Sequence, residues 1–462
     1  MRVFVRLFTL GIFERHPARV FVTIGVVFVA AYLSAFTLVP REGGRVLNGD
    51  AIQYYAYFRS MAIDHDLDFT NDYRLLYAPA TEEAARTNVW LTSTTSAGRP
   101  PNQMSIGPAL LWAPFFGVIY FVLALLRPIG VIVPLDGIAA PFPLSAGVAG
   151  IVYAALGAWF CYRACRVLVP ERPAFWGAMV AWLASPALYY SLVSPAYSHA
   201  PSMFASAAFC DVWLRTRDDD RSRRYVWLGL IAGLAALVRW QDVVVLALPG
   251  FELMTAAARG RRSLVSLARP LAIVAAAIVL MLVPQFLAWH AIYGQAVVIP
   301  QGAGFMRWTS PALVPVLLSL RHGLLTWTPA VVVALVGFWF VIRRDALVGW
   351  SVLAVFGVTL YVNASVSDWW AGEAFGARRF VSDTPLFALG LACLFARNFW
   401  TRHPVVLRWV AVALVASNAL FLLQYQLFMR GGLALAPYPT SVQQVLLDRF
   451  TLPWRLFTYL MR

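Results

Sequence analysis

Residues 20–39 read VFVTIGVVFVAAYLSAFTLV and contain no charged side chain. A helix of about 20 apolar residues spans the hydrocarbon core of a bilayer, so this stretch predicts a transmembrane helix. Similar apolar runs recur at 143–163, 174–193, 199–214, 225–238, 242–257, 270–290, 325–342, 346–363, 381–396 and 405–428. The pattern excludes a single membrane anchor and predicts an all-α polytopic membrane protein with about eleven transmembrane helices.

The composition supports this fold class. Of the 462 residues, 60% are hydrophobic and only 13% are charged, whereas an average soluble domain is about 25% charged. A soluble globular enzyme is therefore excluded. The four cysteines lie in or beside apolar runs, so we expect small core residues and no disulfide framework or metal-ligand cluster. They are Cys161, Cys165, Cys210 and Cys393.

The net charge of +15 comes from 37 basic and 22 acidic residues, and every basic residue is an arginine. The arginines are dispersed between the apolar runs, so membrane orientation explains them better than nucleic-acid binding does. Four of them precede the first apolar run, which predicts a cytoplasmic N-terminus. Because the chain has no lysine, any side-chain cation that binds a phosphate must be arginine.

Residues 107–126 (GPALLWAPFFGVIYFVLALL) decide the parity of the membrane crossings. If this segment crosses, the basic segment at 163–172 lies outside and every later basic loop is inverted. If it returns to the outer side, 21 of the 37 arginines lie in six cytoplasmic segments, as orientation by positive charge favours. Pro108 and Pro114 also suit a bent element. We therefore predict a re-entrant or interfacial helix here.

The remaining organisation is simple: one transmembrane domain over residues 1–462, with a long outer loop at 40–142 and no separate soluble domain. Within this loop, Asp50 precedes a predicted helix over 51–63 whose apolar face can rest on the membrane. Three roles are open for Asp50: an N-cap of this helix, a general base directed at an acceptor hydroxyl, or a metal ligand.

An acidic run follows that helix, with carboxylates at Asp64, Asp66, Asp68 and Asp72. A calcium loop that begins at the first of these would need glycine at its sixth position and glutamate at its twelfth, but this chain has phenylalanine and leucine there. We therefore expect a solvated loop.

Two further outer segments carry polar residues. His199 follows Ser194–Ser198 between two predicted spans, and it is either a hydrogen-bonded structural residue or a substrate or metal ligand. Arg239 and Asp242 interrupt two apolar runs. They either pair with each other or leave Arg239 free to bind a phosphate or substrate.

The stretch at 368–379, DWWAGEAFGARR, is the most informative of the outer segments. Tandem tryptophans are common in interfacial belts, but that role does not explain the neighbouring carboxylates and the paired arginines. Arg378 and Arg379 suit bidentate phosphate binding. On the outer side, orientation by positive charge cannot account for them.

With these segments in order, the chain resembles the GT-C superfamily, polytopic glycosyltransferases that use polyprenyl-phosphate sugars. Protein O-mannosyltransferases and the lipid A aminoarabinose transferase are relatives. The resemblance covers most of the chain, and the order of its motifs is more specific than any one of them. The motifs are Gly49-Asp50, NQMSIGP at 102–108, YSHA at 197–200, GLAALVR at 233–239, RHGLLTWTP at 321–329 and FGARRF at 375–380.

The resemblance implies an inverting transfer from a polyprenyl-monophosphate sugar to a glycan, lipid or protein acceptor. The cavity would face the outer, periplasmic side of a bacterial inner membrane. Asp50 would activate the acceptor or hold a metal, and Arg239, Arg378 and Arg379 would bind the donor phosphate. The expected substrate-binding residues are His199, His322, Trp369, Trp370 and Glu373.

Cofactor use is left open by the resemblance. Many relatives carry a second acidic residue where this chain has 194–199, so a divalent metal would have to rely on Asp50 and His199. Two other functions also remain: a flippase for lipid-linked glycans, and a glycan polymerase or ligase that uses a diphosphate-linked donor. The absence of a nucleotide-binding loop argues against a soluble nucleotide-sugar donor.

Overall fold

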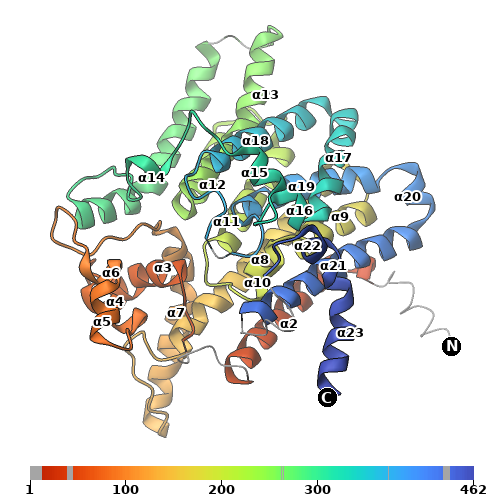
Figure 1. The fold of residues 1–462 in the computed structure, drawn as a ribbon. Helices are drawn as coiled ribbons and strands as arrows, with labels where there is room; N and C mark the ends of the chain where they lie inside the picture. Colours follow the sequence, from red (N-terminus) through yellow and green to blue (C-terminus); the bar gives the residue numbers. More distant parts are fainter. Residues whose placement is uncertain are drawn as a thin grey trace.

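The structure is a computed structural model that describes residues 13–38, 45–261, 263, 265–372, 374–429 and 438–461. These residues form an all-helical bundle (Figure 1), as the sequence predicts. Within the described ranges, β pairing is limited to one bridge between Met306 and Val366.

Each of the eleven predicted spans coincides with a helix of the bundle. The helices are α2 (Pro17–Leu38), α8 (Pro141–Leu168), α9 (Glu171–Leu183), α11 (His199–Thr216), α12 (Ser222–Val238), α13 (Ala247–Ala258), α14 (Ala268–Tyr293), α17 (Pro329–Arg344), α18 (Ala346–Ala364), α19 (Thr384–Phe395) and α21 (Pro404–Met429).

The number of crossings is not confirmed at eleven. In the part of the chain that the structure describes, seven helical segments are long and apolar enough to cross a membrane. Two of the other predicted spans form shorter helices with a proline at or near the shortened end, where it removes a backbone donor. Thus α9 ends at Leu183, just before Pro186, and α17 begins at Pro329.

The short elements between these helices cap or connect the bundle. They are η1 (Phe13–Arg15), η4 (Arg127–Ile129), α10 (Ala187–Leu192), η5 (Trp240–Leu246), η6 (Val265–Leu267), η7 (Ala303–Phe305), α15 (Leu313–Leu318), α16 (Leu324–Trp327), η8 (Arg378–Asp383), α20 (Asn398–Arg402), α22 (Val442–Leu446) and α23 (Asp448–Leu460).

The packing of α2 against α8 bears on the predicted parity. A Cβ at Gly25 would contact Ala155, and a Cβ at Gly147 would contact Tyr32, so residue numbers rise along one helix as they fall along the other. The two helices are therefore antiparallel. This direction agrees with the prediction that the chain does not cross the membrane between α2 and α8. One crossing between them would make the two helices parallel.

The segment at 107–126 forms one continuous helix, α7 (Gly107–Leu126). No re-entrant turn interrupts it; an interfacial helix, the other predicted alternative, stays a prediction, and Gly107–Ile129 is also long and apolar enough to cross a membrane. Pro108 lies in the first turn, where no backbone donor is needed. The helix runs antiparallel to α8: Tyr153 donates to the Leu111 carbonyl, and the Phe116 and Phe142 rings are 4.7 Å apart.

The outer loop packs as a second core beside the bundle. It contains α3 (Asp50–Arg59), the π-helical turn η3 (Ser60–Asp64), α4 (Thr70–Tyr77), α5 (Glu82–Thr87) and α6 (Val89–Thr92). Every residue of α3 after Asp50 is buried. The expectation that one face of this helix rests on the membrane is therefore wrong, because protein surrounds it.

The acidic run is also more ordered than expected. Arg59 Nη1 lies 2.6 Å from Asp64 and 2.7 Å from Asp72, and the Asp72 side chain is fully buried. The Asp66 carboxylate accepts hydrogen bonds from Ser60 and from the Asp68 backbone. Asp72 is buried because the buried Arg59 guanidinium needs compensating charge, whereas Asp66 is exposed and Asp64 and Asp68 are partly exposed, so the rest of the run is solvated as expected.

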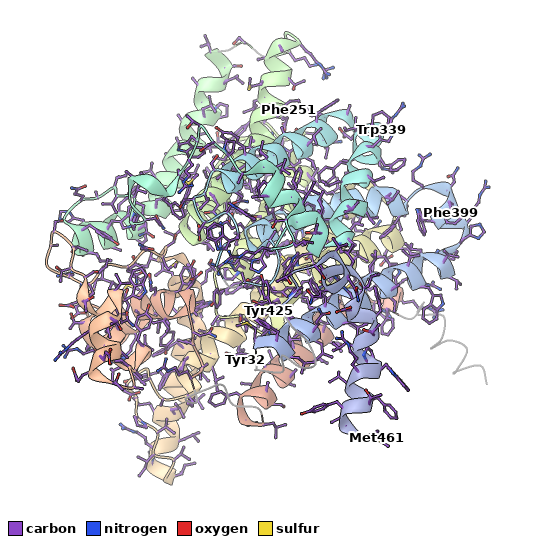
Figure 2. The ribbon with its side chains drawn as sticks, in the orientation of Figure 1. Tyr32, Phe251, Trp339, Phe399, Tyr425 and Met461 are labelled. Carbon is purple, nitrogen blue, oxygen red and sulfur yellow. The ribbon has the colours of Figure 1, made fainter. Side chains whose placement is uncertain are left out.

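Large apolar side chains cover the periphery of the bundle, as expected where a surface faces lipid. Trp339 and Phe399 are about half exposed, and Met461 at the end of α23 is more so (Figure 2). Tyr425, by contrast, is buried inside the bundle. These observations agree with a multi-pass membrane protein.

A buried carboxylate fixes the start of the chain to two distant helices. Glu14 accepts hydrogen bonds from Arg172 and Trp176 of α9 and from Arg408 of α21, all at 2.7–2.9 Å. Burial alone would raise the pKa of Glu14, but the bonds from Arg408, Trp176 and Arg172 lower it overall.

We expect Glu14→Gln to reduce the melting temperature of the purified protein in detergent, because breaking one partner of a buried charged cluster costs about 3–5 kcal/mol. A carboxylate with a lowered folded pKa stabilises the fold above its ordinary pKa of 4.5 and less as pH falls through the lowered value. The wild type should thus lose stability below pH 4.5, and the variant should lose less.

Glu171→Gln, an exposed change at the start of α9, is the matched control and should alter neither the melting temperature nor its pH dependence. An identical acid-induced loss in the wild type and in Glu14→Gln would contradict the assigned role.

Candidate active site

A cavity of about 340 Å³ lies where the start of α3, the start of η5 and the loop before η8 meet. Its lining includes Asp50, Arg239, Arg378 and Arg379. The structure thus brings together the predicted catalytic carboxylate and all three predicted phosphate-binding arginines, although they lie in segments far apart in the sequence.

Asp50 is the first residue of α3 and follows Gly49, which has φ of 53°. Gly49 is the N-cap, and its helix has no side-chain cap, so the interpretation of Asp50 as an N-cap is wrong. Instead, the Asp50 carboxylate accepts a hydrogen bond from Arg378 Nη1 at 2.9 Å. The Asp50 side chain is 32% exposed, so a small molecule in the cavity can reach it.

The two adjacent arginines have different partners. Arg378 binds Asp50, whereas Arg379 binds the carboxylate and the backbone carbonyl of Asp368, both at 2.7 Å. Burial alone would lower the pKa of Arg378, but Asp50 raises it overall. For Arg379, burial dominates over the attraction of Asp368 and lowers the pKa to about 10. Both side chains remain cationic at neutral pH.

Arg239 is held by the segment that contains His199. Arg239 Nη1 lies 3.0 Å from His199 Nδ1 and 3.3 Å from Ser198 Oγ. Because a guanidinium only donates, Nδ1 must accept, and the imidazole has its proton on Nε2. The alternative pairing of Arg239 with Asp242 is not formed: Asp242 accepts a hydrogen bond from Ser202 Oγ at 2.5 Å.

The residues do not fit a metal ion beside Asp50. Asp50 and His199 each contact an arginine, and a metal cation would be repelled by these guanidinium groups. Among the described residues, no three His, Cys, Asp or Glu side chains are grouped so that they could hold a metal. The groups around Asp50 therefore suit a reaction that uses no metal at this carboxylate.

Four predicted substrate-binding residues are not in the lining of this cavity: His199, His322, Trp369 and Trp370. His322 is buried and has φ of 62°; burial lowers its pKa to about 4. Its Nδ1 lies 2.8 Å from the Trp370 carbonyl, and its Nε2 lies 3.0 Å from the Tyr438 hydroxyl. The neutral imidazole therefore donates to the carbonyl and accepts from the hydroxyl, which positions the tryptophan segment.

The tryptophans themselves pack outside the cavity lining. The Arg321 guanidinium lies 4.8 Å from the Trp370 ring, and Trp369 packs partly buried against the hydrophobic core. Glu373 lies outside the described residues, so its predicted role remains a prediction.

Uncharged polar residues complete the lining, and the sequence analysis did not select them as site residues. They are Gln53, Tyr54, Tyr77, Gln103, Ser105, Gln241, Gln301 and Asn363. Gln53 also fixes the 102–108 motif, because its side chain accepts from the Gln103 backbone at 3.1 Å and its carbonyl accepts from Asn102 at 2.9 Å. In the sequence, only Gln103 and Ser105 of this set could have been found as lining residues, because they belong to the motif at 102–108.

The polar cavity adjoins an apolar pocket of about 500 Å³. The pocket is lined mainly by α14, η5 and the segment at 298–308, and it shares Gln103, Met104, Trp240 and Phe305 with the cavity. A cationic chamber next to an apolar one suits an amphipathic ligand with an anionic head group.

Gly49 provides a test of this geometry. A Cβ at Gly49 would lie 2.6 Å from the Tyr197 hydroxyl, whereas a Cβ at Gly98, which has φ of 75°, would meet nothing within 4 Å. Both Gly→Ala changes place alanine at positive φ, which costs of the order of 1 kcal/mol. We expect Gly49→Ala to lower the melting temperature clearly more than Gly98→Ala. Equal shifts would show that Tyr197 does not restrict Gly49.

Comparison with known proteins gives a fold relationship only. No protein-family model matches the sequence, and no curated protein matches it at a significant level. Among solved structures, ArnT from Cupriavidus metallidurans in the apo state aligns over 93% of this chain and 76% of its own, with 15% identity and a TM-score of 0.52.

The archaeal oligosaccharyltransferase AglB from Archaeoglobus fulgidus, in complex with an inhibitory peptide and a dolichol-phosphate, aligns over 93% of this chain with 11% identity and a TM-score of 0.52. The alignment covers 61% of AglB, so this chain spans less than two thirds of that protein. Both proteins are GT-C superfamily members. The chain thus has the GT-C fold that the sequence motifs implied.

Proposed function

We propose that this protein is a membrane glycosyltransferase that moves a sugar from a polyprenyl-monophosphate donor to an acceptor at the outer face of a bacterial inner membrane. The observation that carries the proposal is the contact between Asp50 and Arg378 inside a cavity that adjoins an apolar pocket. A transferase of this kind needs a base, a cationic phosphate site and room for a lipid chain, and these three features meet here.

The donor fits the two chambers by its chemistry. The apolar pocket is large enough for several isoprene units, since its volume is about 500 Å³. The phosphate would lie in the adjoining cavity, where Arg239, Arg378 and Arg379 supply charge-assisted hydrogen bonds. The similarity to AglB, whose structure contains a dolichol-phosphate, supports a monophosphate lipid.

The transfer needs no covalent enzyme intermediate. Asp50 accepts the proton of the acceptor hydroxyl, and the acceptor oxygen forms a bond to the anomeric carbon. The bond from that carbon to the phosphate oxygen breaks, and the lipid phosphate leaves with the electron pair. Arg378 and Arg379 stabilise the charge that develops on the leaving phosphate. A single displacement of this kind inverts the anomeric configuration.

The ion pair also couples donor binding to the base. While Arg378 donates a hydrogen bond to Asp50, one carboxylate oxygen is occupied and does not face an acceptor hydroxyl. A donor phosphate competes for the same guanidinium and thereby releases the Asp50 carboxylate to face the acceptor. The base thus becomes active when the donor is bound.

Asp50→Asn should lower the rate of transfer by roughly 10²- to 10⁴-fold, because the amide cannot accept the proton. The measurement is transfer of a radiolabelled sugar from polyprenyl monophosphate by the purified protein in liposomes. Asp345→Asn, which removes an ion-paired carboxylate at the start of α18, is the control for folding. Full activity of Asp50→Asn would exclude Asp50 as the base.

The same liposomes distinguish the other functions. A flippase would move the labelled donor between leaflets without transferring its sugar. A polymerase or ligase would use the diphosphate-linked donor and not the monophosphate.

Arg378→Ala and Arg379→Ala should each weaken donor binding roughly 10- to 150-fold, because a hydrogen bond to a charged group contributes about 1.5–3 kcal/mol. The affinity is measured by titrating sugar-free polyprenyl monophosphate into the purified protein. Arg86→Ala, an exposed change on α5, is the matched control and should leave the affinity unchanged. Unaltered affinity in both variants would remove these arginines from the donor site.

A further inference from the structure

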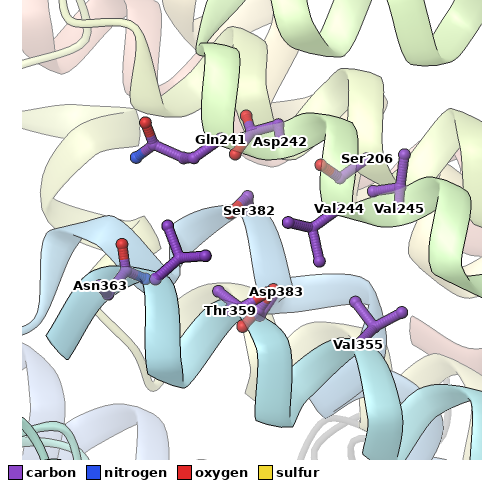
Figure 3. A pocket seen from close by; sticks show the side chains of 11 residues that line it. Ser206, Gln241, Asp242, Val244, Val245, Val355, Thr359, Asn363, Ser382 and Asp383 are labelled. Carbon is purple, nitrogen blue, oxygen red and sulfur yellow. The ribbon is translucent and has the colours of Figure 1, made fainter. Parts of the chain in front are cut away.

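A second, much smaller pocket adjoins the arginine-lined cavity and contains two buried carboxylates. Asp242 comes from η5 and Asp383 from the end of η8, and each side chain belongs to a residue only 4% exposed. Figure 3 shows Asp242 on one side of the pocket and Asp383 beside Thr359 on the other, with Ser382 between them.

Several polar groups that line this pocket have no hydrogen-bond partner among the described residues. They are Ser206 Oγ, Asp383 Oδ2 and both amide atoms of Asn363. Ser206 is fully buried and Asn363 is 2% exposed. A buried polar group without a partner loses about 1–3 kcal/mol of solvation. Three unpartnered side chains around one small space therefore point to a ligand that satisfies them together.

The charge of the pocket is compensated only in part: the Arg239 guanidinium attracts the Asp242 carboxylate from a distance, and Ser202 donates a hydrogen bond to it. Within the described ranges, no arginine forms an ion pair with Asp242 or Asp383, and the three nearby arginines are committed elsewhere. Arg239 contacts His199, Arg378 contacts Asp50, and Arg379 contacts Asp368. Two carboxylates in a buried site need a positive charge or a proton.

We propose that this pocket binds one hard metal cation, held by oxygen atoms of Asp242, Asp383, Ser206 and Asn363. Carboxylate, hydroxyl and amide oxygens are ligands for cations such as Ca²⁺, Mg²⁺ and Na⁺, and the pocket contains no sulfur or imidazole for a softer metal. Its free volume of about 10 Å³ is close to the minimum for one water-sized particle.

A cation at this position would connect elements that carry the arginines of the large cavity. Asp242 follows Arg239 by three residues, and Asp383 follows Arg379 by four. A cation between the carboxylates therefore links η5 to η8, the two elements that present these arginines to the cavity. Ser206 on α11 and Asn363 on α18 extend the link to two helices of the bundle. This site is separate from Asp50 and does not depend on the proposed transfer reaction.

The test is a thermal titration of the purified full-length protein in detergent after removal of metals with a chelator. CaCl₂, MgCl₂ and NaCl are added separately, with choline chloride at matched ionic strength as the blank. We expect at least one metal salt to raise the melting temperature saturably by roughly 3–6 °C above the blank. Equilibrium dialysis followed by elemental analysis should then find about one ion of that metal per chain.

Asp383→Asn should abolish this rise. If Asp383→Asn does not fold, Ser206→Ala serves instead, because it removes one oxygen from a small side chain and should raise the half-saturating concentration by roughly 10-fold or more. The matched controls are Asp211→Asn, a buried ion-paired carboxylate on α11, and Ser351→Ala, a buried serine on α18. Both should keep the wild-type response to the metal.

Three results would overturn the proposal. The first is an equal melting temperature in every salt, with no ion found by elemental analysis. In that case, a melting temperature that rises on acidification would show that Asp242 and Asp383 share a proton instead. The second is a metal response that survives both Asp383→Asn and Ser206→Ala. The third is loss of the response in Asp50→Asn, which would move the ion into the other cavity. None of these readouts involves sugar transfer, so failure here is distinguishable from failure of the proposed function.

Discussion

The ion pair between Asp50 and Arg378 is the contact on which the arrangement of the candidate site depends, because it joins positions 328 residues apart at 2.9 Å. Asp50 belongs to the loop at 40–142, whose buried side chains pack in one cluster with residues of α8, α12 and α14, whereas Arg378 begins the short helix η8 that precedes α19. A partly buried guanidinium is stable only beside compensating charge. The pair therefore brings these two segments together at a defined place and forms the wall of the cavity.

Three arginines line the cavity around this pair at one end of an apolar bundle. Each arginine that lines the cavity has a protein partner, which keeps it ordered without a ligand: Asp50 for Arg378, Asp368 for Arg379 and His199 for Arg239. Two of these partners are carboxylates that neutralise their arginines, so the three arginines and two carboxylates of the lining leave one excess positive charge. The cavity is thus preorganised for an anion, and the neighbouring apolar pocket restricts the choice to anions that carry an apolar chain.

Two buried carboxylates that form no ion pair with an arginine of the described residues, Asp242 and Asp383, lie behind this basic wall. Asp242 and Asp383 occupy the same elements, η5 and η8, that carry Arg239 and Arg379. The arginines line the large cavity, whereas the two carboxylates line the small pocket, where Figure 3 shows them. A movement of either element would change both sites together.

The sequence by itself determined the membrane class, the positions of the bundle helices and the arginines that share the cavity with Asp50, because apolar length and charge are local properties of the chain. It did not determine that α7 is one continuous helix, that α3 is buried on all sides, or that Arg239 contacts His199 rather than Asp242. Nor did it reveal that Trp369, Trp370 and His322 lie outside the cavity lining. Those features depend on which side chains meet across long sequence separations, and only the tertiary packing of two cores decides that.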